Sequence, residues 1–167
     1  MKPLQQQMDL RNATPADFSS ILTLNQESVH FLSPLDETRL LQLHKQSVYH
    51  RVVETGKGLA GFLLAFAQAA DYDSPNNRWF AERYDRFLYI DRIVVASEAQ
   101  GLGIGRQLYA DLFAFAHAQG YPKVTCEFDL DPPNPASAAF HRKFGFIEVG
   151  QQMVANNKLV SLQSVQI

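Results

Sequence analysis

A glycine-rich turn between an apolar strand and an amphipathic helix constrains the fold of this chain more than any other feature. Residues Arg86–Ala96 are rich in Ile, Val and aromatic side chains, and Gly101, Gly103 and Gly105 follow shortly after them. Glycines in such a turn let backbone N–H groups converge on an anion, and the start of the following helix adds a partial positive charge. The turn therefore predicts a site for a phosphate or pyrophosphate group.

Two common phosphate-binding loops do not fit this turn. A Walker A loop ends in Gly-Lys-Ser/Thr, whereas Gly105 is followed by Arg106 and Gln107. The dinucleotide fingerprint needs a third glycine three positions after its second, and Arg106 stands three positions after Gly103. A tight strand-to-helix turn without any ligand is the alternative that the glycines alone leave open.

Composition limits the remaining classes of function. The 167 residues suit a single domain, residues 1–167, and the formal net charge of −2 comes with no run of Lys or Arg, which argues against nucleic acid or an anionic membrane as a partner. The lone cysteine, Cys126, leaves no disulfide framework or thiolate zinc site, and we expect it to be a core residue and the protein to hold no metal. The N-terminus lacks the apolar region of a signal peptide, and Leu59–Ala70 is interrupted and too short to cross a bilayer. We therefore expect a cytoplasmic protein.

Periodicity and capping residues divide the chain into strands and helices. Thr14 before Pro15 and Asn134 before Pro135 are typical helix starts. We expect strands at Met8–Ala13, Val48–Glu54, Leu59–Ala67, Arg86–Ala96, Val124–Leu130, Phe146–Ala155 and Lys158–Gln166, and helices at Pro15–Glu27, from Asp36 through Leu43, from the glycine turn to Gly120 and at Pro135–Phe144. The order β-α-α-β-β-β-α-β-α-β-β predicts an α/β (α+β) fold with a mixed sheet flanked by helices, and residues Ala70–Asp85 are predicted to be a long loop.

The turn resembles a known cofactor loop. From Gln100 to Gly105 the chain matches the pattern Q-x-x-G-x-G, which is similar to the acyl-CoA pyrophosphate loop of the GNAT N-acetyltransferase superfamily, and the preceding strand has the pattern I-x-V at Ile93 and Val95. The resemblance implies a mostly antiparallel central sheet and acetyl-CoA as cosubstrate. It also implies that the main chain of Ile93 and Val95 pairs with the pantetheine arm. The pyrophosphate would be held by Gln100 and by the amides of Gly101, Leu102, Gly103, Gly105 and Arg106.

A second segment is similar to the second GNAT signature. It has Asn134, a small residue three positions later at Ser137, and the pair Gly145-Phe146. The resemblance implies that Asn134 caps a helix and reaches the amides of CoA. Where most members carry a tyrosine that protonates the departing thiolate, this chain has His141, whose imidazolium could donate a proton. A solvent-facing helix histidine is the alternative.

Acetyl transfer also needs a neutral amine, and therefore a carboxylate near it. By the resemblance, Asp91 stands where several members place this group, and period-two alternation puts it on one face of the strand with Ile93 and Val95. A salt bridge from Asp91 to Arg92 or Arg86 is the structural alternative. The next strand, which we expect to splay from the first, and its end carry the further candidates Glu127, Asp129 and Asp131.

The acceptor pocket is expected between the first two helices and the long loop. Its candidate residues are Trp79, Phe80 and Tyr84 on the loop and Glu27, His30 and Phe31 at the rim. The sequence thus predicts an N-acetyltransferase that moves an acetyl group directly to a primary amine of a small molecule or peptide. A non-catalytic acyl-CoA-binding module and a generic nucleotide-binding protein are the alternatives. The resemblance also makes a homodimer, formed through sheets or C-terminal strands, an assembly to expect.

Overall fold

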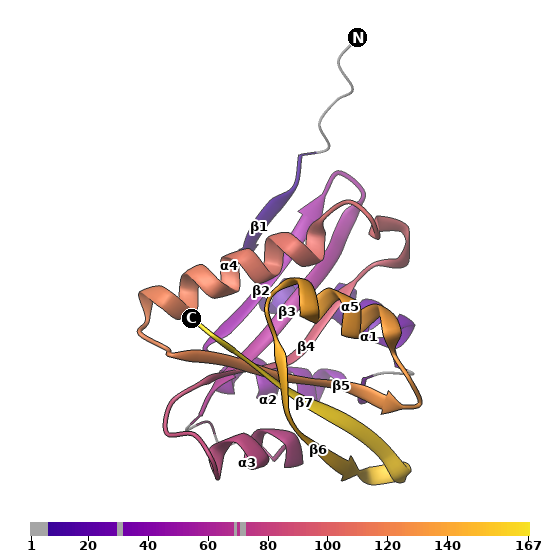
Figure 1. Ribbon diagram of the computed structural model, residues 1–167. Helices are drawn as coiled ribbons and strands as arrows, with labels where there is room; N and C mark the ends of the chain where they lie inside the picture. Colours follow the sequence, from indigo (N-terminus) through magenta and orange to yellow (C-terminus); the bar gives the residue numbers. More distant parts are fainter. Residues whose placement is uncertain (1–6, 30–31, 69, 71–72) are drawn as a thin grey trace. The chain divides into compact units, whose positions relative to one another are not determined.

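The computed structural model describes residues 7–29, 32–68, 70 and 73–167 (Figure 1). His30 and Phe31, two of the expected rim residues, lie outside this part of the chain. The helices are α1 (Phe18–Glu27), α2 (Glu37–Gln46), α3 (Pro75–Ala81), α4 (Ile104–Ala118) and α5 (Pro135–Lys143), and the strands are β1 (Asp9–Asn12), β2 (Tyr49–Thr55), β3 (Gly58–Ala67), β4 (Leu88–Val95), β5 (Lys123–Asp131), β6 (Ile147–Val154) and β7 (Lys158–Gln166).

The strands form one sheet in the order β1-β2-β3-β4-β5-β7-β6. The pairs β1–β2, β2–β3, β5–β7 and β6–β7 are antiparallel, and the pair β4–β5 is parallel. This mixed, mostly antiparallel sheet confirms the predicted fold class. The parallel pairing joins Leu88 to Val124 and Tyr89 to Thr125, and among the described residues it extends no further although both strands continue.

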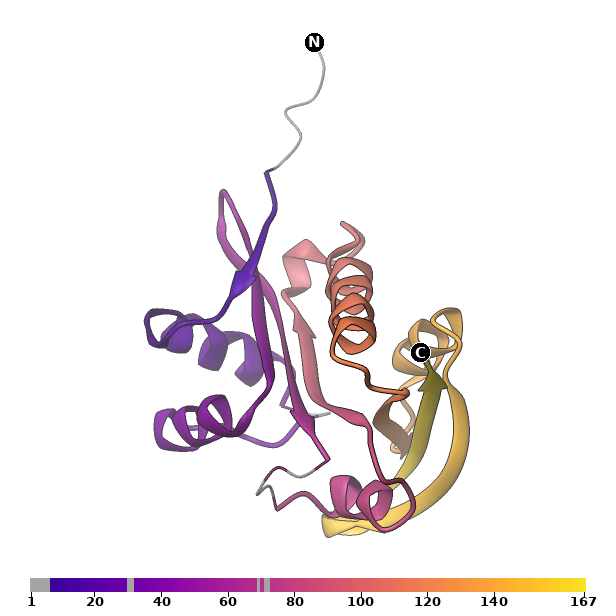
Figure 2. The same cartoon turned by 90° about the vertical axis from the view of Figure 1, so that its left-hand side faces the viewer.

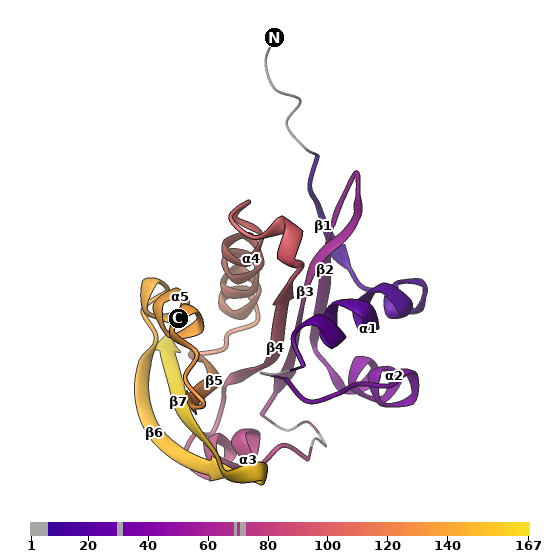
Figure 3. The ribbon, with the colours of Figure 1, turned by 90° about the vertical axis from the view of Figure 1, so that its right-hand side faces the viewer.

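The chain divides into two compact units, and the first comprises the residues up to Ala65 together with Arg92–Leu112. Figures 2 and 3 show α1 and α2 on one face of β2 and β3, with the start of α4 on the other. Asp36 caps α2 as predicted, because its carboxylate accepts a 2.7 Å hydrogen bond from the backbone nitrogen of Arg39. Fully buried side chains between the helices and the strands include Ile21, Leu40, Leu43, Val52, Phe62 and Leu64.

The second unit comprises Phe66–Asp91 and Phe113–Ile167, with the strands β5, β7 and β6 side by side. Glu127 stands opposite Leu162, and Leu162 stands opposite Gly150, so these three residues share one face of the strands. Their sequence neighbours face the other side.

Two helices of this unit pack against opposite faces of these strands. On the face of Gly150, α3 places the ring of Trp79. On the other face, α5 places His141 beside Phe128, with ring centroids 5.6 Å apart. The carboxylate Glu127 and the imidazole His141 therefore belong to different faces of the same three strands.

The predicted long loop at residues 70–85 is wrong, because it contains α3. Ser74 caps this helix by accepting from the backbone nitrogen of Asn77, and Pro75 occupies its first turn. Phe80 has no solvent exposure and packs against the rings of Tyr84 and Tyr89, with centroids 6.2 and 6.0 Å away. The aromatic residues that suggested a recognition loop are therefore in part the apolar side of a short helix.

Candidate active site

The glycine turn precedes α4 and leaves its first amides without helical partners. The first backbone hydrogen bond of the helix runs from the nitrogen of Gln107 to the carbonyl of Gly103, at 3.0 Å. The N–H groups from Gly103 to Arg106 therefore precede the hydrogen-bond ladder of α4, as expected at a helix N-terminus. Together with the helix dipole they favour an anion at this end.

The backbone of this turn requires two of its glycines. Gly101 and Gly103 have φ angles of +83° and +81°, which side-chain-bearing residues rarely adopt. A Cβ atom on Gly101 would meet no atom within 4 Å, so the turn is open there. A Cβ atom on Gly103 would lie 3.3 Å from an Nη2 atom of Arg106, whose guanidinium thus lies beside the turn. An open turn of amides beside an arginine fits a pyrophosphate, and Gln100 and Leu102 are exposed in it.

The strand before the turn alternates as predicted. Asp91, Ile93 and Val95 are half-buried, whereas Arg92 and Val94 between them are buried. The three half-buried residues thus follow the period of one strand face. The main chain of Ile93 and Val95 belongs to the same unit as the glycine turn.

Arg92, one of the two arginines considered as a partner of Asp91, makes buried contacts with α1. Its Nη1 atom donates to the Oδ1 atom of Asn25 at 2.9 Å and to the carbonyl of Ser33 at 3.1 Å. The side chain of Asn25 donates to the same carbonyl at 3.1 Å. The other arginine, Arg86, donates to the carbonyls of Gln119 and Gly120.

A carboxylate on β5 has the most unusual environment among the described acids. The hydroxyl of Tyr89 lies 2.9 Å from Oε1 and 2.7 Å from Oε2 of Glu127, and the side chain of Asn76 also hydrogen-bonds Glu127. Burial, with smaller contributions from the charges of Asp91 and Asp129, raises the pKa of Glu127 to about 8 against the opposing hydrogen bonds of Tyr89 and Asn76. Glu127 can therefore exchange a proton near neutral pH, as a general base must.

The sequence offered Glu127 only as a runner-up and gave no role to Tyr89 or Asn76. Period-two alternation places Tyr89 on the strand face of Asp91, but which residue of β5 meets the hydroxyl of Tyr89 depends on the strand register, which no local pattern records. Asp129, the second runner-up, is buried and paired with the amine of Lys158 at 3.2 Å, and burial raises its pKa. Asp131 is exposed at the end of β5.

The second motif forms α5 as predicted. Asn134 caps the helix, because its side chain accepts from the backbone nitrogen of Ser137 at 3.3 Å. His141 is buried, so the alternative of a solvent-facing histidine is wrong. Burial lowers its pKa, and its Nδ1 atom lies 2.7 Å from the carbonyl of Ser137. Since a carbonyl only accepts, Nδ1 carries the proton of the neutral ring.

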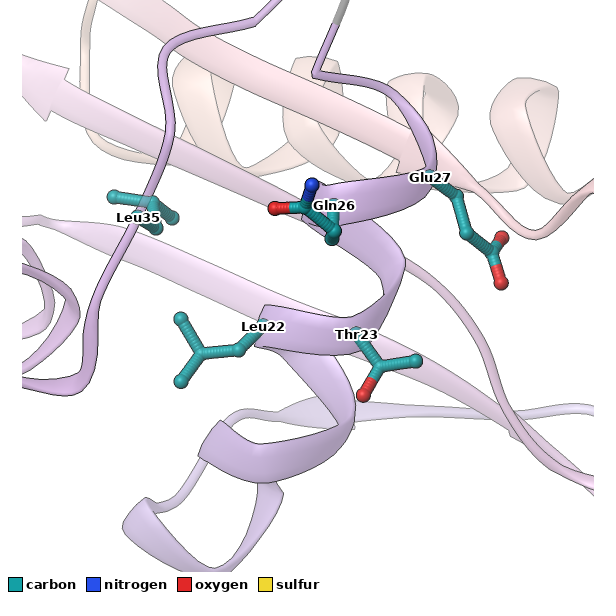
Figure 4. A pocket seen from close by; sticks show the side chains of 5 residues that line it. All are labelled: Leu22, Thr23, Gln26, Glu27 and Leu35. Carbon is teal, nitrogen blue, oxygen red and sulfur yellow. The ribbon is translucent and has the colours of Figure 1, made fainter.

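A pocket of about 520 Å³ lies beside α1 in the first unit (Figure 4). It is lined by Leu22, Thr23, Gln26, Glu27 and Leu35. Figure 4 shows Leu22 and Gln26 on the side of α1 toward Leu35, and Thr23 and Glu27 farther round the helix. The predicted rim residue Glu27 thus does line a pocket, whereas Phe80 is part of the core and does not. Trp79 packs over Gly150, and Tyr84 lies beneath the amine of Lys123, 3.7 Å from its ring centroid.

The described residues contain no group of three or more His, Cys, Asp or Glu side chains placed to hold a metal ion. In the same part of the chain, no helix is long and apolar enough to cross a membrane.

Comparison with known proteins identifies relatives of this fold. The acetyltransferase (GNAT) family profile matches residues 16–146. Ard1 from Thermoplasma volcanium has a similar structure, with a TM-score of 0.78 at 16% identity, covering 96% of this chain and 97% of that one. The ribosomal-protein-S18-alanine N-acetyltransferase from Escherichia coli gives 0.73 at 14%, covering 96% and 94%. The structure of yncA from Salmonella typhimurium with its cofactor acetyl-CoA gives 0.71 at 20%, covering 96% and 94%. A search of curated proteins finds no match.

Proposed function

Since the chain belongs to the acetyltransferase (GNAT) family, we propose that it transfers an acetyl group directly from acetyl-CoA to a primary amine of a small molecule or peptide. The observation that carries this proposal is Glu127, a half-buried residue whose carboxyl accepts a 2.7 Å hydrogen bond from the hydroxyl of Tyr89 and has a pKa raised to about 8 by burial. A structural carboxylate usually has an ordinary or lowered pKa, whereas proton transfer near neutral pH requires a raised one.

The glycine turn is the proposed site of the cofactor. The amides of Gly103, Gly105 and Arg106 precede the ladder of α4, and the open turn at Gly101 suits an anion. When bound there, acetyl-CoA would supply the activated acetyl thioester. The pyrophosphate would be held by Gln100, Gly101, Leu102, Gly103, Gly105 and Arg106, with Ile93, Val95 and Asn134 contacting the rest of the cofactor.

Glu127 is the proposed general base. An α-amino group has an unperturbed pKa of about 7.7–8.0, so a carboxylate with a pKa of about 8 can accept its proton with little change in free energy. Asp91, the base expected by resemblance, is proposed to act beside it, because its charge raises the pKa of Glu127. Asp91 would then act on the reaction through its charge on Glu127.

His141 is the proposed proton donor to the departing sulfur, and since it lies on the other face of the strands β5, β7 and β6 from Glu127, it would reach the thioester from the side opposite to the base. Its Nδ1 proton is engaged by the carbonyl of Ser137, so the donated proton would come from Nε2 of the imidazolium. Because burial lowers the pKa of His141, this acid form is a minority near neutral pH. Its contribution to the rate is then smaller than that of Glu127.

The pocket beside α1 is the proposed acceptor site. Among its described lining residues, Glu27 carries a charge, and Leu22 and Leu35 add apolar surface, a combination that suits an amine with an aliphatic part. One structural neighbour is an alanine N-acetyltransferase of ribosomal protein S18, so peptide amines belong beside small-molecule amines among the acceptors to test.

Calorimetric titration of the purified chain with acetyl-CoA, with CoA and ATP as controls, tests the cofactor. We expect micromolar binding of acetyl-CoA and CoA and none of ATP. An amine screen followed by release of the CoA thiol then tests turnover. Binding without turnover on any amine would favour the non-catalytic acyl-CoA-binding module, and absence of binding would overturn the enzymatic proposal.

A further inference from the structure

Two amide side chains, the buried Asn76 and the half-buried Gln152, form a chain that ends at Glu127. The Nε2 atom of Gln152, on β6, donates to the Oδ1 atom of Asn76, on α3, at 3.0 Å. Asn76 is only 8% exposed, and its side chain also hydrogen-bonds Glu127. Since the oxygen of the Asn76 amide accepts from Gln152, its NH₂ group is the end that donates to the carboxylate.

The contact with Gln152 decides which way the Asn76 amide points. An asparagine amide can rotate to present either an acceptor oxygen or a donor nitrogen. An oxygen turned toward Glu127 would repel the carboxylate, whereas the NH₂ group stabilises it. Because Gln152 donates to the oxygen, it favours the orientation in which the nitrogen faces Glu127.

The groups around Glu127 come from several elements of the second unit. Tyr89 and Asp91 lie on β4, and Cys126 and Asp129 on β5, with Asp129 paired to Lys158 of β7. The hydroxyl of Tyr89 and the amide of Asn76 favour the ionised carboxylate, whereas the two aspartates oppose it.

We propose that Asn76 and Gln152 are positioning residues for Glu127, with Gln152 acting through the amide of Asn76 to hold the carboxylate in its ionised, proton-accepting orientation. The proposal rests on the proposed function only in that Glu127 is the base. Gln152 does not need to touch either substrate.

The arrangement predicts a hierarchy of effects. Removal of the Asn76 amide takes one hydrogen bond from the carboxylate and therefore raises the pKa of Glu127. Removal of the Gln152 amide frees Asn76 to rotate, which raises the same pKa by less. Once Asn76 has been replaced, replacement of Gln152 has no further effect, because its route to the carboxylate is gone.

The test compares Asn76→Ala, Gln152→Ala and the double variant with matched controls. Asn77→Ala removes a buried amide from the same helix, and Gln151→Ala removes the neighbouring amide of β6, which contacts Glu148 instead. The titration of Glu127 is followed by NMR of protein with ¹³C-labelled glutamate carboxyls, assigned through Glu127→Gln. The pH dependence of kcat/KM for acetyl transfer is measured in parallel.

We expect the NMR midpoint of Glu127 and the acidic limb of kcat/KM to move upward together, by about one pH unit in Asn76→Ala and by less in Gln152→Ala. Asn77→Ala and Gln151→Ala should leave both unchanged. An unmoved midpoint in Gln152→Ala, or equal shifts in the controls, would overturn the proposal. If Asn76→Ala does not fold, the Gln152→Ala midpoint decides alone.

The NMR midpoint separates this proposal from the proposed function. If the protein shows no acetyl transfer but the Glu127 midpoints shift as expected, the positioning proposal stands and the role of Glu127 as base falls. If the variants change the activity but not the Glu127 midpoint, the proposed function stands and the positioning role of the two amides falls.

Discussion

The indole ring of Trp79 lies directly over the backbone of Gly150. A Cβ atom on Gly150 would be 3.3 Å from the Cε2 atom of the indole and only 2.8 Å from its Cη2 atom, and the second distance is shorter than Cβ atoms show in proteins. Trp79 belongs to α3 and Gly150 to β6, so α3 can pack this closely on β6 only because glycine has no side chain. The same helix carries Asn76.

Gly150→Ala should therefore displace Trp79. We expect a loss of about 1–3 kcal/mol in the free energy of unfolding and a fall of roughly 2–10 °C in Tm. Gly56→Ala is the matched control, since a Cβ atom there meets nothing within 4 Å. Equal melting temperatures for the two variants would contradict the contact.

Gly103→Val should abolish binding of acetyl-CoA. The φ angle of +81° strains any residue with a Cβ atom, and the added side chain would meet Arg106. Gly120→Val is the control, because Gly120 has a similar φ of +74° after the last residue of α4. Calorimetry should find normal affinity in the control and none in Gly103→Val, with circular dichroism reporting the fold of both. Unchanged affinity in Gly103→Val would remove the turn from the cofactor site.

Glu127→Gln should lower kcat by about 10²–10⁴-fold, since the amide cannot accept a proton. Asp91→Asn should keep most of the activity and move the acidic limb of kcat/KM to lower pH, because a charge that raises the pKa of Glu127 is removed. Steady-state kinetics between pH 6 and pH 9 distinguish the two roles. A larger loss in Asp91→Asn than in Glu127→Gln would make Asp91 the base.

Glu127→Gln should also make the fold more stable at alkaline pH. The folded-state pKa of about 8 lies above the ordinary value of 4.5, so the protonated form favours folding. Its contribution is complete below pH 4.5 and is lost as the pH rises through 8. Glutamine stays neutral, and the variant should therefore gain about 1–2 kcal/mol over the wild type at pH 8.5, or roughly 3–6 °C in Tm, and nothing near pH 4.5. Differential scanning calorimetry at both pH values checks this, with the exposed Glu98→Gln as control.

His141→Ala should lower kcat by about tenfold and leave the KM for acetyl-CoA nearly unchanged. The loss is modest because burial keeps the imidazolium a minority form. A fall in kcat that grows with decreasing pH, where the wild-type ring is protonated, is the signature of an acid role. An unchanged kcat across the pH range would take His141 out of the mechanism.

Local signals in the sequence were sufficient for most elements of the fold. Asp36 and Asn134 were expected to begin helices, and both side chains accept hydrogen bonds from backbone nitrogens in the first turn. The helix α3 was missed although Ser74 and Pro75 are a start signal, because its seven residues include two asparagines and show little periodicity. Its stability comes from packing that no local pattern records, such as that of Phe80.

In the candidate site, too, the features that depend on local sequence were predicted and those that depend on tertiary packing were not. The glycine turn was recognised because its backbone conformation depends on residues adjacent in sequence. The surroundings of Glu127 were not, because Asn76, Tyr89 and Gln152 come from three different elements. A pKa raised by burial depends on the neighbours that tertiary packing brings together, and period-two alternation assigns only a face.

Gly61 has a consequence for engineering of the cofactor site. A Cβ atom at this position of β3 would lie 2.8 Å from the carbonyl of Val94 and 3.0 Å from the Cγ2 atom of Ile104. Because glycine carries only a hydrogen atom in place of a side chain, β3 can lie this close to both the strand that precedes the glycine turn and the first residue of α4. A library that randomises β3 should keep glycine at this position. Any larger residue would push both ends of the glycine turn away from β3, although no residue of the turn itself is changed.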